Sequence, residues 1–303
     1  MGMETSGTGT VFALAGGGNL GAAQVGMLYA LLEAGIRPDA IVGTSIGALN
    51  GAYLAGHADL DGVEELAELW ASVRRQDVFP LSMRHVLRGL VGHRNFLFES
   101  LGLRSLIARA QLGYSKLEDA PIRFCAVATD LASGEVAVLT HGNATEALLA
   151  SAAIPSLFPP VEIEGRLLVD GGVVANVPIL EADSLGPSAI YVLPTLPDDI
   201  SSVPANAPAM MQRSMALAAR PAARAAMAQV ASHTEVRVLP APSSAGHLSI
   251  FDFGATRQLV DEAYVLTTSW LDSDHRPIEA APVTRHTSEA TLGALREAKL
   301  AVA

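Results

Sequence analysis

The chain has 303 residues, half of them hydrophobic, which is enough for a sizeable buried core in one large domain or two small ones. Its formal net charge of −11 argues against nucleic acid as a partner, because a phosphate-binding surface needs a basic face. The single cysteine, Cys125, excludes an intramolecular disulfide and a four-cysteine zinc site.

No apolar run approaches the ~20 residues that a membrane-spanning helix requires, and residues 1–10 lack the positive segment of a signal peptide. We therefore expect a cytoplasmic protein with neither a signal peptide nor a transmembrane helix. The eight histidines show no metal-binding spacing such as HExxH, so we expect no metal site.

Short β-branched runs alternate with helical patterns along the chain, which is typical of an α/β fold around a largely parallel sheet. Strands are predicted at residues 10–15 and 40–42, and each is followed by a helix. The remaining predicted elements are helices at residues 59–74, 145–153, 210–230 and 259–270 and strands at residues 122–129, 135–140, 163–169, 189–193 and 235–239.

The composition changes after residue 271, where the chain becomes polar and contains proline. We therefore predict one compact domain over residues 10–271. Residues 272–303 are predicted to form a C-terminal appendage that is partly disordered, with a frayed helix over residues 289–300.

Residues 43–47 have the sequence GTSIG, a GxSxG pattern that follows a short apolar strand and opens a helix. A serine on such a sharp turn is exposed near the positive end of the helix dipole. The flanking glycines Gly43 and Gly47 fit this turn for two reasons. The backbone of the turn is strained, and side chains at these two positions would collide with the neighbouring chain. Ser45 is therefore the candidate nucleophile, and the alternative is an ordinary glycine-rich turn.

A second glycine-rich run, GGGNLG, covers residues 16–21 between the first predicted strand and its helix. Its backbone N–H groups would suit an oxyanion hole, which holds the negative oxygen of a tetrahedral intermediate. The run also has the form of the GxGxxG fingerprint of dinucleotide-binding proteins. That fingerprint requires an acidic residue after the second strand, whereas Asp39 precedes this strand and the GxSxG turn occupies the required position. This mismatch favours the oxyanion hole.

The predicted strand at residues 163–169 runs into Asp170, Gly171 and Gly172. An aspartate at a strand end followed by two glycines is compatible with a simple turn. It is equally compatible with a rigidly held carboxylate whose flanking backbone can approach a partner closely. The presence of the other two motifs favours the second interpretation.

Together, these motifs resemble those of the patatin-like phospholipase family, in its bacterial form. Three stretches carry the resemblance: the glycine-rich loop and helix at residues 16–28, the nucleophile elbow at residues 43–51, and residues 151–172, which end in DGG. The resemblance covers residues 10–271 in order. It implies a three-layer α/β fold in which helices flank a central, largely parallel sheet.

The resemblance also implies a lipid acyl hydrolase that acts as a phospholipase A, a lysophospholipase or an esterase, without a metal or organic cofactor. Ser45 would attack the ester carbonyl, and Asp170 would take its proton and later activate water, with no histidine involved. The implied oxyanion hole consists of Gly17 and Gly18, whose N–H groups bind the oxyanion, and Gly16, which shapes the loop. Supporting positions in the motifs are Gly21, Gly43, Gly47, Gly171 and Gly172.

Leu20 is a departure from the family pattern, which often has arginine or lysine shortly after the three glycines. A cation there could attract a phosphate headgroup, whereas leucine could pack against an acyl chain or the following helix. We therefore expect a preference for neutral esters over anionic phospholipids.

Residues 74–98 combine basic and hydrophobic side chains. In a predicted helix over residues 83–91, the apolar side chains share one face, and Arg84, His85 and Arg88 share the other. This pattern is typical of a lid or of a peripheral membrane contact, and equally of a helix that covers the core with a solvated basic face.

Two other functional classes remain open on the sequence. A conventional Ser-His-Asp hydrolase could use Ser45 and Asp170 with His233 or His247, because this chain order is permitted. A lipid-binding scaffold that has lost activity is the other, and only Leu20 favours it.

Overall fold

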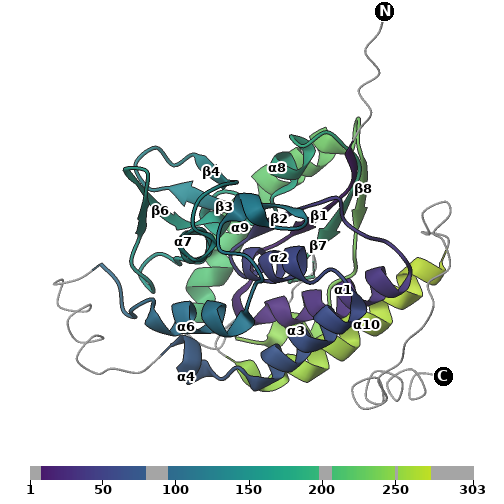
Figure 1. Ribbon diagram of the computed structural model, residues 1–303, viewed down its shortest axis with the longest axis horizontal. Coiled ribbons are helices and arrows are strands. Elements are labelled where there is room, and N and C mark those ends of the chain that lie inside the picture. The colour runs from purple at the N-terminus through teal and green to yellow at the C-terminus, as the bar shows by residue number, and fades with distance from the viewer. Residues whose placement is uncertain (1–7, 80–94, 198–206, 250–251, 274–303) are drawn as a thin grey trace, which may run out of the picture.

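The computed structural model describes residues 8–79, 95–197, 207–249 and 252–273. Within them lies a sheet of eight strands, whose hydrogen-bonded order is β5-β6-β3-β2-β1-β7-β8, with β4 also paired to β3 (Figure 1). The strands are β1 (Thr8–Leu14), β2 (Ala40–Thr44), β3 (Arg123–Asp130), β4 (Val136–Leu139), β5 (Val161–Ile163), β6 (Arg166–Asp170), β7 (Pro187–Leu193) and β8 (Glu235–Val238).

The central part of the sheet is parallel. Strand β1 pairs with β2 and β7, β2 pairs with β3, and β7 pairs with β8, all in parallel. The pairings β3–β4, β3–β6 and β5–β6 are antiparallel. This arrangement confirms the predicted α/β fold with a largely parallel sheet.

The helices lie on both faces of the sheet (Figure 1). They are α1 (Ala22–Glu33), α2 (Ile46–Gly56), α3 (Leu60–Ser72), α4 (Arg75–Val78), α6 (Leu101–Ala110), α7 (Ala144–Ser151), α8 (Ile179–Asp183), α9 (Ala207–Val230) and α10 (Thr256–Asp272). Short 3₁₀ turns include η1 (Gly18–Gly21), η3 (Gly171–Val173) and η5 (Phe253–Ala255).

Strand β1 shows how the sheet separates two hydrophobic cores. Phe12 and Leu14 point into the larger core, which also contains side chains of α1, α2, α3 and α10. Val11 and Ala13 point to the opposite face, where α8 and the end of α9 cover the sheet. Because all four side chains are fully buried, β1 is hydrophobic on both faces, as a central parallel strand must be.

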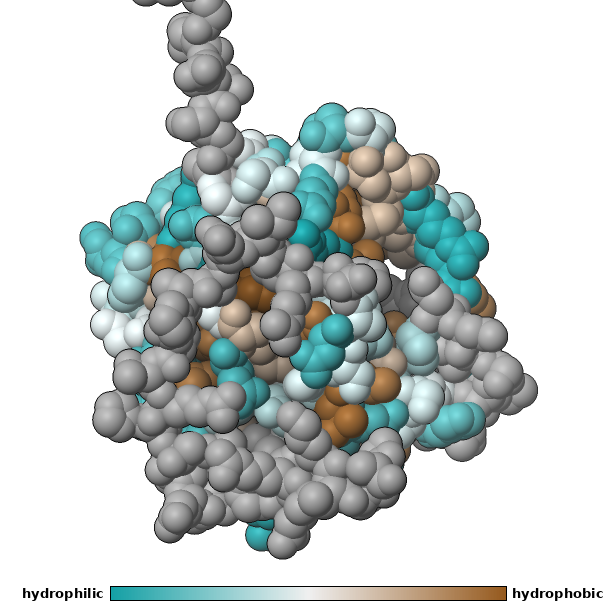
Figure 2. Space-filling model, turned by 90° about the vertical axis from the view of Figure 1, so that its right-hand side faces the viewer, coloured by the Kyte–Doolittle hydropathy of each residue, from teal (hydrophilic) through white to brown (hydrophobic). Residues whose placement is uncertain are grey.

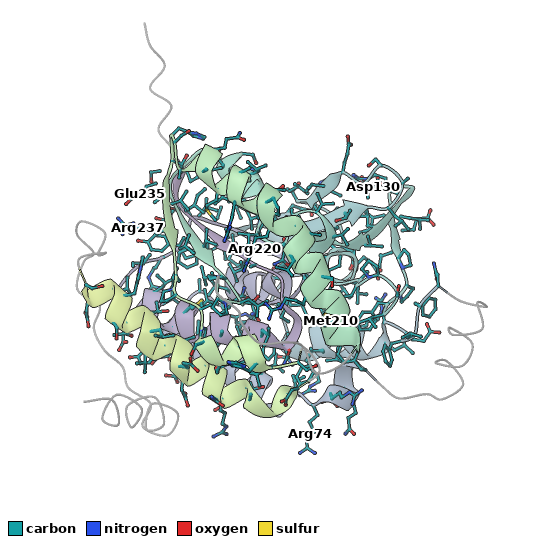
Figure 3. The ribbon with its side chains drawn as sticks, turned by 180° about the vertical axis from the view of Figure 1, so that it is seen from behind. Arg74, Asp130, Met210, Arg220, Glu235 and Arg237 are labelled. Carbon is teal, nitrogen blue, oxygen red and sulfur yellow. The ribbon has the colours of Figure 1, made fainter. Side chains whose placement is uncertain are left out.

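Helix α9 crosses the back of the molecule, and Figure 3 shows Met210 near one end and Arg220 further along. Its last part packs on the sheet through Ala226, Met227 and Val230. Figure 2 shows the side of the molecule on which β8 lies, where hydrophilic and hydrophobic residues are interspersed.

One predicted strand is wrong in detail. The sequence predicts a single strand over residues 163–169, but the chain reverses at Glu164 and Gly165 and forms the β5–β6 hairpin. Both residues have positive φ, 51° and 75°, as the tight two-residue turn of a hairpin requires. The glycine is the signal that could have revealed the turn.

The described residues run from β1 to α10 with gaps at residues 80–94, 198–206 and 250–251, and the bounds of the predicted domain, residues 10–271, stay a prediction. The proposed appendage at residues 274–303 and the basic helix over residues 83–91 lie outside them, so both remain predictions. Within the proposed lipid-contact segment, Phe79 and Phe98 are buried and pack on Phe158. These two side chains therefore contribute to the core.

Among the described residues, no helix is both long enough and apolar enough to cross a membrane.

Candidate active site

The pairing of β3 brings Ser45 and Asp170 together. One edge of β3 pairs with β2 up to Thr44, which lies opposite Val127. Because β4 occupies the other edge, β6 continues along the same edge as β2, with Asp170 opposite Ala128. Strands β2 and β6 run in opposite directions, so their carboxyl ends meet at neighbouring residues of β3. A serine and an aspartate 125 positions apart in the sequence therefore become neighbours.

Ser45 occupies the turn between β2 and α2 in an unusual backbone conformation. Its φ is 55° and its ψ is −122°, values that side-chain-bearing residues rarely adopt. Such conformations persist only where the surrounding structure enforces them, and they cluster at functional sites. The Ser45 Oγ donates a hydrogen bond of 2.5 Å to Oδ2 of Asp170.

Ser151, at the end of α7, holds the backbone of this turn. Its Oγ accepts a hydrogen bond of 2.9 Å from the Ser45 N–H and donates one of 2.6 Å to the Val127 carbonyl. Ser151 is completely buried, so these bonds fix the serine turn against β3. The sequence placed Ser151 in the third family stretch but gave no sign of this role, which depends on the fold.

Asp170 is buried, with 6% of its surface exposed. Its Oδ1 accepts a hydrogen bond of 2.7 Å from the Gly172 N–H, and its backbone carbonyl accepts one of 3.0 Å from Thr129. Burial raises the pKa of the Asp170 carboxyl from 3.8 to about 6, although the hydrogen bonds from Ser45 and Gly172 lower it. A carboxylate with this pKa can take a proton near neutral pH.

The glycines of the motifs allow the chain segments to approach closely. At Gly47, a Cβ would collide with the Leu14 carbonyl, because α2 begins directly against the end of β1. At Gly171, a Cβ would collide with the Val127 carbonyl. The other three supporting glycines, Gly21, Gly43 and Gly172, would also each place a Cβ within 3 Å of a neighbouring atom.

The glycine-rich loop after β1 contains two backbone N–H groups without a hydrogen-bond partner in the described part of the chain. The N–H of Gly16 is used, since it donates a hydrogen bond of 2.9 Å to the Asn176 carbonyl. Among the described residues, no acceptor takes up the N–H of Gly17 or Gly18. Both glycines are half-buried, and Gly18 lines the same cavity as Ser45. Backbone N–H groups without a partner in such a place suit the predicted oxyanion hole.

A largely hydrophobic cavity reaches Ser45 and Gly18. Two asparagines, Asn19 and Asn50, also line it. The rest of the lining is Ile46, Leu49, Tyr53, Leu66, Leu69, Trp70, Val73, Val78, Phe79, Leu103, Leu106, Ile107, Ala110, Leu112, Leu148, Ala152, Ile154, Phe158 and Phe253.

No described histidine hydrogen-bonds to Ser45 or Asp170, and none lines the cavity. His233, one candidate for a conventional triad, instead bonds to Asp183 at 2.9 Å on the surface. His247, the other candidate, lies in the short turn Ser243–His247 after β8. The described part of the chain also contains no group of three or more histidine, cysteine, aspartate or glutamate side chains arranged to hold a metal ion.

Leu20 lies in the larger hydrophobic core, with 2% of its surface exposed, and it does not line the cavity. The side chain therefore packs against the protein, which is one of the two sequence-based alternatives. The expected preference for neutral esters stays a prediction.

The model of the patatin-like phospholipase family matches residues 12–183, more than half of the chain. Patatin-like phospholipase domain-containing protein 7 of Rattus norvegicus is 32% identical over 62% of this chain and 14% of its own length. Lysophospholipase nte1 of Neurospora crassa is 30% identical over 64% of this chain and 12% of its own. An uncharacterised NTE family protein of Mycobacterium bovis is 35% identical over 55% of this chain and 43% of its own.

Among solved structures, VipD of Legionella pneumophila matches with a TM-score of 0.45 and 15% identity, over 88% of this chain and 67% of that one. The curated relatives are much longer than the region they share with this chain. The family model matches both the strand that leads to Ser45 and the strand that ends in Asp170, and the chain therefore belongs to the patatin-like phospholipase family.

Proposed function

We propose that this protein hydrolyses lipid acyl esters, with Ser45 as the nucleophile and Asp170 as the general base. The observation that carries the proposal is the direct Ser45–Asp170 hydrogen bond beside a hydrophobic cavity. Membership of the patatin-like phospholipase family supports the same chemistry.

In the acylation step, Asp170 takes the proton of the Ser45 hydroxyl while Oγ attacks the ester carbonyl. The carbonyl oxygen becomes an oxyanion, which the N–H groups of Gly17 and Gly18 stabilise. The intermediate then collapses, and the protonated Asp170 returns the proton to the departing alcohol. Ser45 is left as an acyl ester.

Deacylation repeats these steps with water. Asp170 takes a proton from a water molecule, whose oxygen attacks the acyl-enzyme carbonyl. Collapse of the second intermediate releases the fatty acid and restores the Ser45 hydroxyl. The raised pKa of Asp170 suits this exchange, because the carboxyl must both accept and return a proton.

The cavity supports a substrate with a fatty acyl chain. Its lining is almost entirely hydrophobic and begins at the nucleophile, so an acyl chain can be buried while its ester carbonyl lies at Ser45. Phospholipids, lysophospholipids and simpler acyl esters all present this group.

Replacement of either member of the dyad tests the proposal. We expect Ser45→Ala and Asp170→Asn each to reduce hydrolysis of p-nitrophenyl butyrate to near background without unfolding the protein. Exposed counterparts, Ser214→Ala and Asp61→Asn, serve as controls and should retain wild-type turnover. Near wild-type activity in either dyad variant would refute the mechanism.

Because no histidine of the described residues hydrogen-bonds to Ser45 or Asp170, a second test is possible. Replacing His233 or His247 with alanine should leave turnover within a few-fold of wild type, whereas a triad member would cost several orders of magnitude. A folded variant at either position with activity lost would support a conventional triad.

A further inference from the structure

A chain of buried amide and indole groups runs beneath the oxyanion loop. The Trp70 indole N–H donates a hydrogen bond of 2.9 Å to Oδ1 of Asn50. The Asn50 amide N–H₂ donates to the Gly21 carbonyl and to Oε1 of Gln24, both at 2.9 Å. Three elements, α3, α2 and α1, each contribute one side chain to this network.

Gln24 extends the network to the other side of the loop. Its amide N–H₂ donates to the carbonyl of Ala15 at 2.8 Å and to the carbonyl of Leu193 at 3.0 Å. Ala15 precedes the three glycines and Gly21 follows them, so the network bonds to both ends of the oxyanion loop.

These contacts fix the side chains as well as the loop. Gln24 and Asn50 are 0% and 2% exposed, and a buried amide is costly unless its groups are paired. Each amide both donates and accepts, which determines its orientation. A network that is satisfied in this way rigidifies the backbone it contacts.

The network leaves the centre of the loop open. Hydrogen bonds hold both its ends, while the N–H groups of Gly17 and Gly18 have no acceptor in the described part of the chain. At the far end, Trp70 and Asn50 line the hydrophobic cavity. The network therefore connects the cavity wall with the backbone that faces the reacting carbonyl.

We propose that Gln24 and Asn50 are positioning residues, which hold the Gly17 and Gly18 N–H groups at the place where the oxyanion forms. Trp70 holds the Asn50 amide in the orientation that this requires. The inference rests on the proposed function, because it concerns the oxyanion of the same ester hydrolysis.

Gln24→Met tests the proposal, because methionine has a similar shape but cannot hydrogen-bond to the loop as an amide does. We expect kcat to fall about ten- to a hundredfold. Removal of a whole oxyanion donor typically lowers kcat by roughly 10²–10³-fold, so the expected loss is smaller or at most comparable. KM should change less than about threefold, since the cavity is untouched. Trp70→Phe removes the indole N–H at the end of the network and also part of the cavity wall, so kcat should fall less than in Gln24→Met while KM also changes.

Inhibitor binding separates positioning from a merely structural role. Ser45 Oγ adds to the carbonyl of an acyl trifluoromethyl ketone, and the serine proton passes to Asp170. The carbonyl oxygen of the adduct is then an oxyanion, which the N–H groups of the loop bind. The affinity of the ketone should fall by the same factor as kcat. The affinity of the corresponding long-chain alcohol, which fills the cavity without forming an oxyanion, should stay unchanged.

Tyr114→Phe is the matched control, because it removes a partly buried hydrogen bond of 2.8 Å to the Ala52 carbonyl of helix α2, the helix that also carries Asn50. It should leave kcat and both affinities as in wild type. If folded Gln24→Met keeps wild-type kcat and ketone affinity, or loses ketone and alcohol affinity equally, the proposal is wrong. Failure of the proposed function would appear separately, as retained hydrolysis by Ser45→Ala.

Discussion

At the scale of single residues, the candidate dyad combines two features that oppose stability. Ser45 has a φ of 55°, and Asp170 places a carboxylate in a buried site. A strained residue costs on the order of 1–3 kcal/mol, and burial disfavours the charged form of a carboxyl. The surrounding hydrogen bonds from Ser151 and Gly172 hold both groups in place. Reactivity at this site therefore comes at the expense of local stability.

The pKa of Asp170 predicts the pH dependence of activity. Under the proposed mechanism Asp170 must be ionised to act as the general base, so kcat/KM should rise with pH, with an inflection near its pKa of about 6, and then reach a plateau. The measurement is kcat/KM for a non-ionising ester between pH 4.5 and 8.5, with circular dichroism to confirm folding. A profile that stays flat down to pH 4.5 would disagree with this account.

The same pKa predicts that Asp170→Asn stabilises the fold. The pKa of Asp170 in the folded protein lies above the ordinary value of 3.8, so the folded state favours the protonated carboxyl. The contribution of this carboxyl to the free energy of unfolding is therefore full below pH 3.8 and is lost as the pH rises through about 6. At pH 8, Asp170→Asn should therefore raise the free energy of unfolding, by up to about 3 kcal/mol. The gain should shrink toward pH 4. Urea denaturation at both pH values checks this, and a variant less stable than wild type at pH 8 would contradict it.

At the scale of elements, the turn between β2 and α2 depends on how closely α2 approaches β1. A Cβ at Gly47 would collide with the backbone carbonyls of Leu14 and Ala15, so Gly47→Ala must displace the helix. We expect a loss of about 1–3 kcal/mol in stability, as for other overpacked sites, and a larger loss of activity because Ser45 moves with the helix. Thermal denaturation and turnover measure the two effects. Wild-type values for both would show that the contact is not needed.

The sequence predicted most elements and all three motifs, because hydrophobic periodicity and glycine positions are local signals. It missed the β5–β6 hairpin, where a two-residue turn divides a run that otherwise looks like one strand. It also could not predict that β2 and β6 meet end to end on β3, since this depends on strand pairing. The roles of Ser151, Gln24 and Asn50 follow from that pairing and from helix packing, so they emerged only from the structure.

At the scale of the whole molecule, side chains from several helices enclose the hydrophobic cavity. Ile107 of α6 lines it and is 4% exposed, whereas Leu101 of the same helix is 70% exposed and does not. Ile107→Trp should therefore reduce kcat/KM for a 16-carbon acyl ester by roughly tenfold or more relative to a four-carbon ester, while Leu101→Trp leaves the ratio unchanged. Equal effects of Ile107→Trp on both esters would show that the acyl chain does not occupy this cavity.

The central claim is that Ser45 is a nucleophile activated by Asp170, and covalent labelling tests it most directly. The protein is treated with a fluorophosphonate, and the modified residue is located by mass spectrometry. We predict a single adduct on Ser45, with labelling slowed at least a hundredfold in Asp170→Asn. An adduct on another residue, or equally fast labelling of Ser45 in that variant, would contradict the assignment of the dyad.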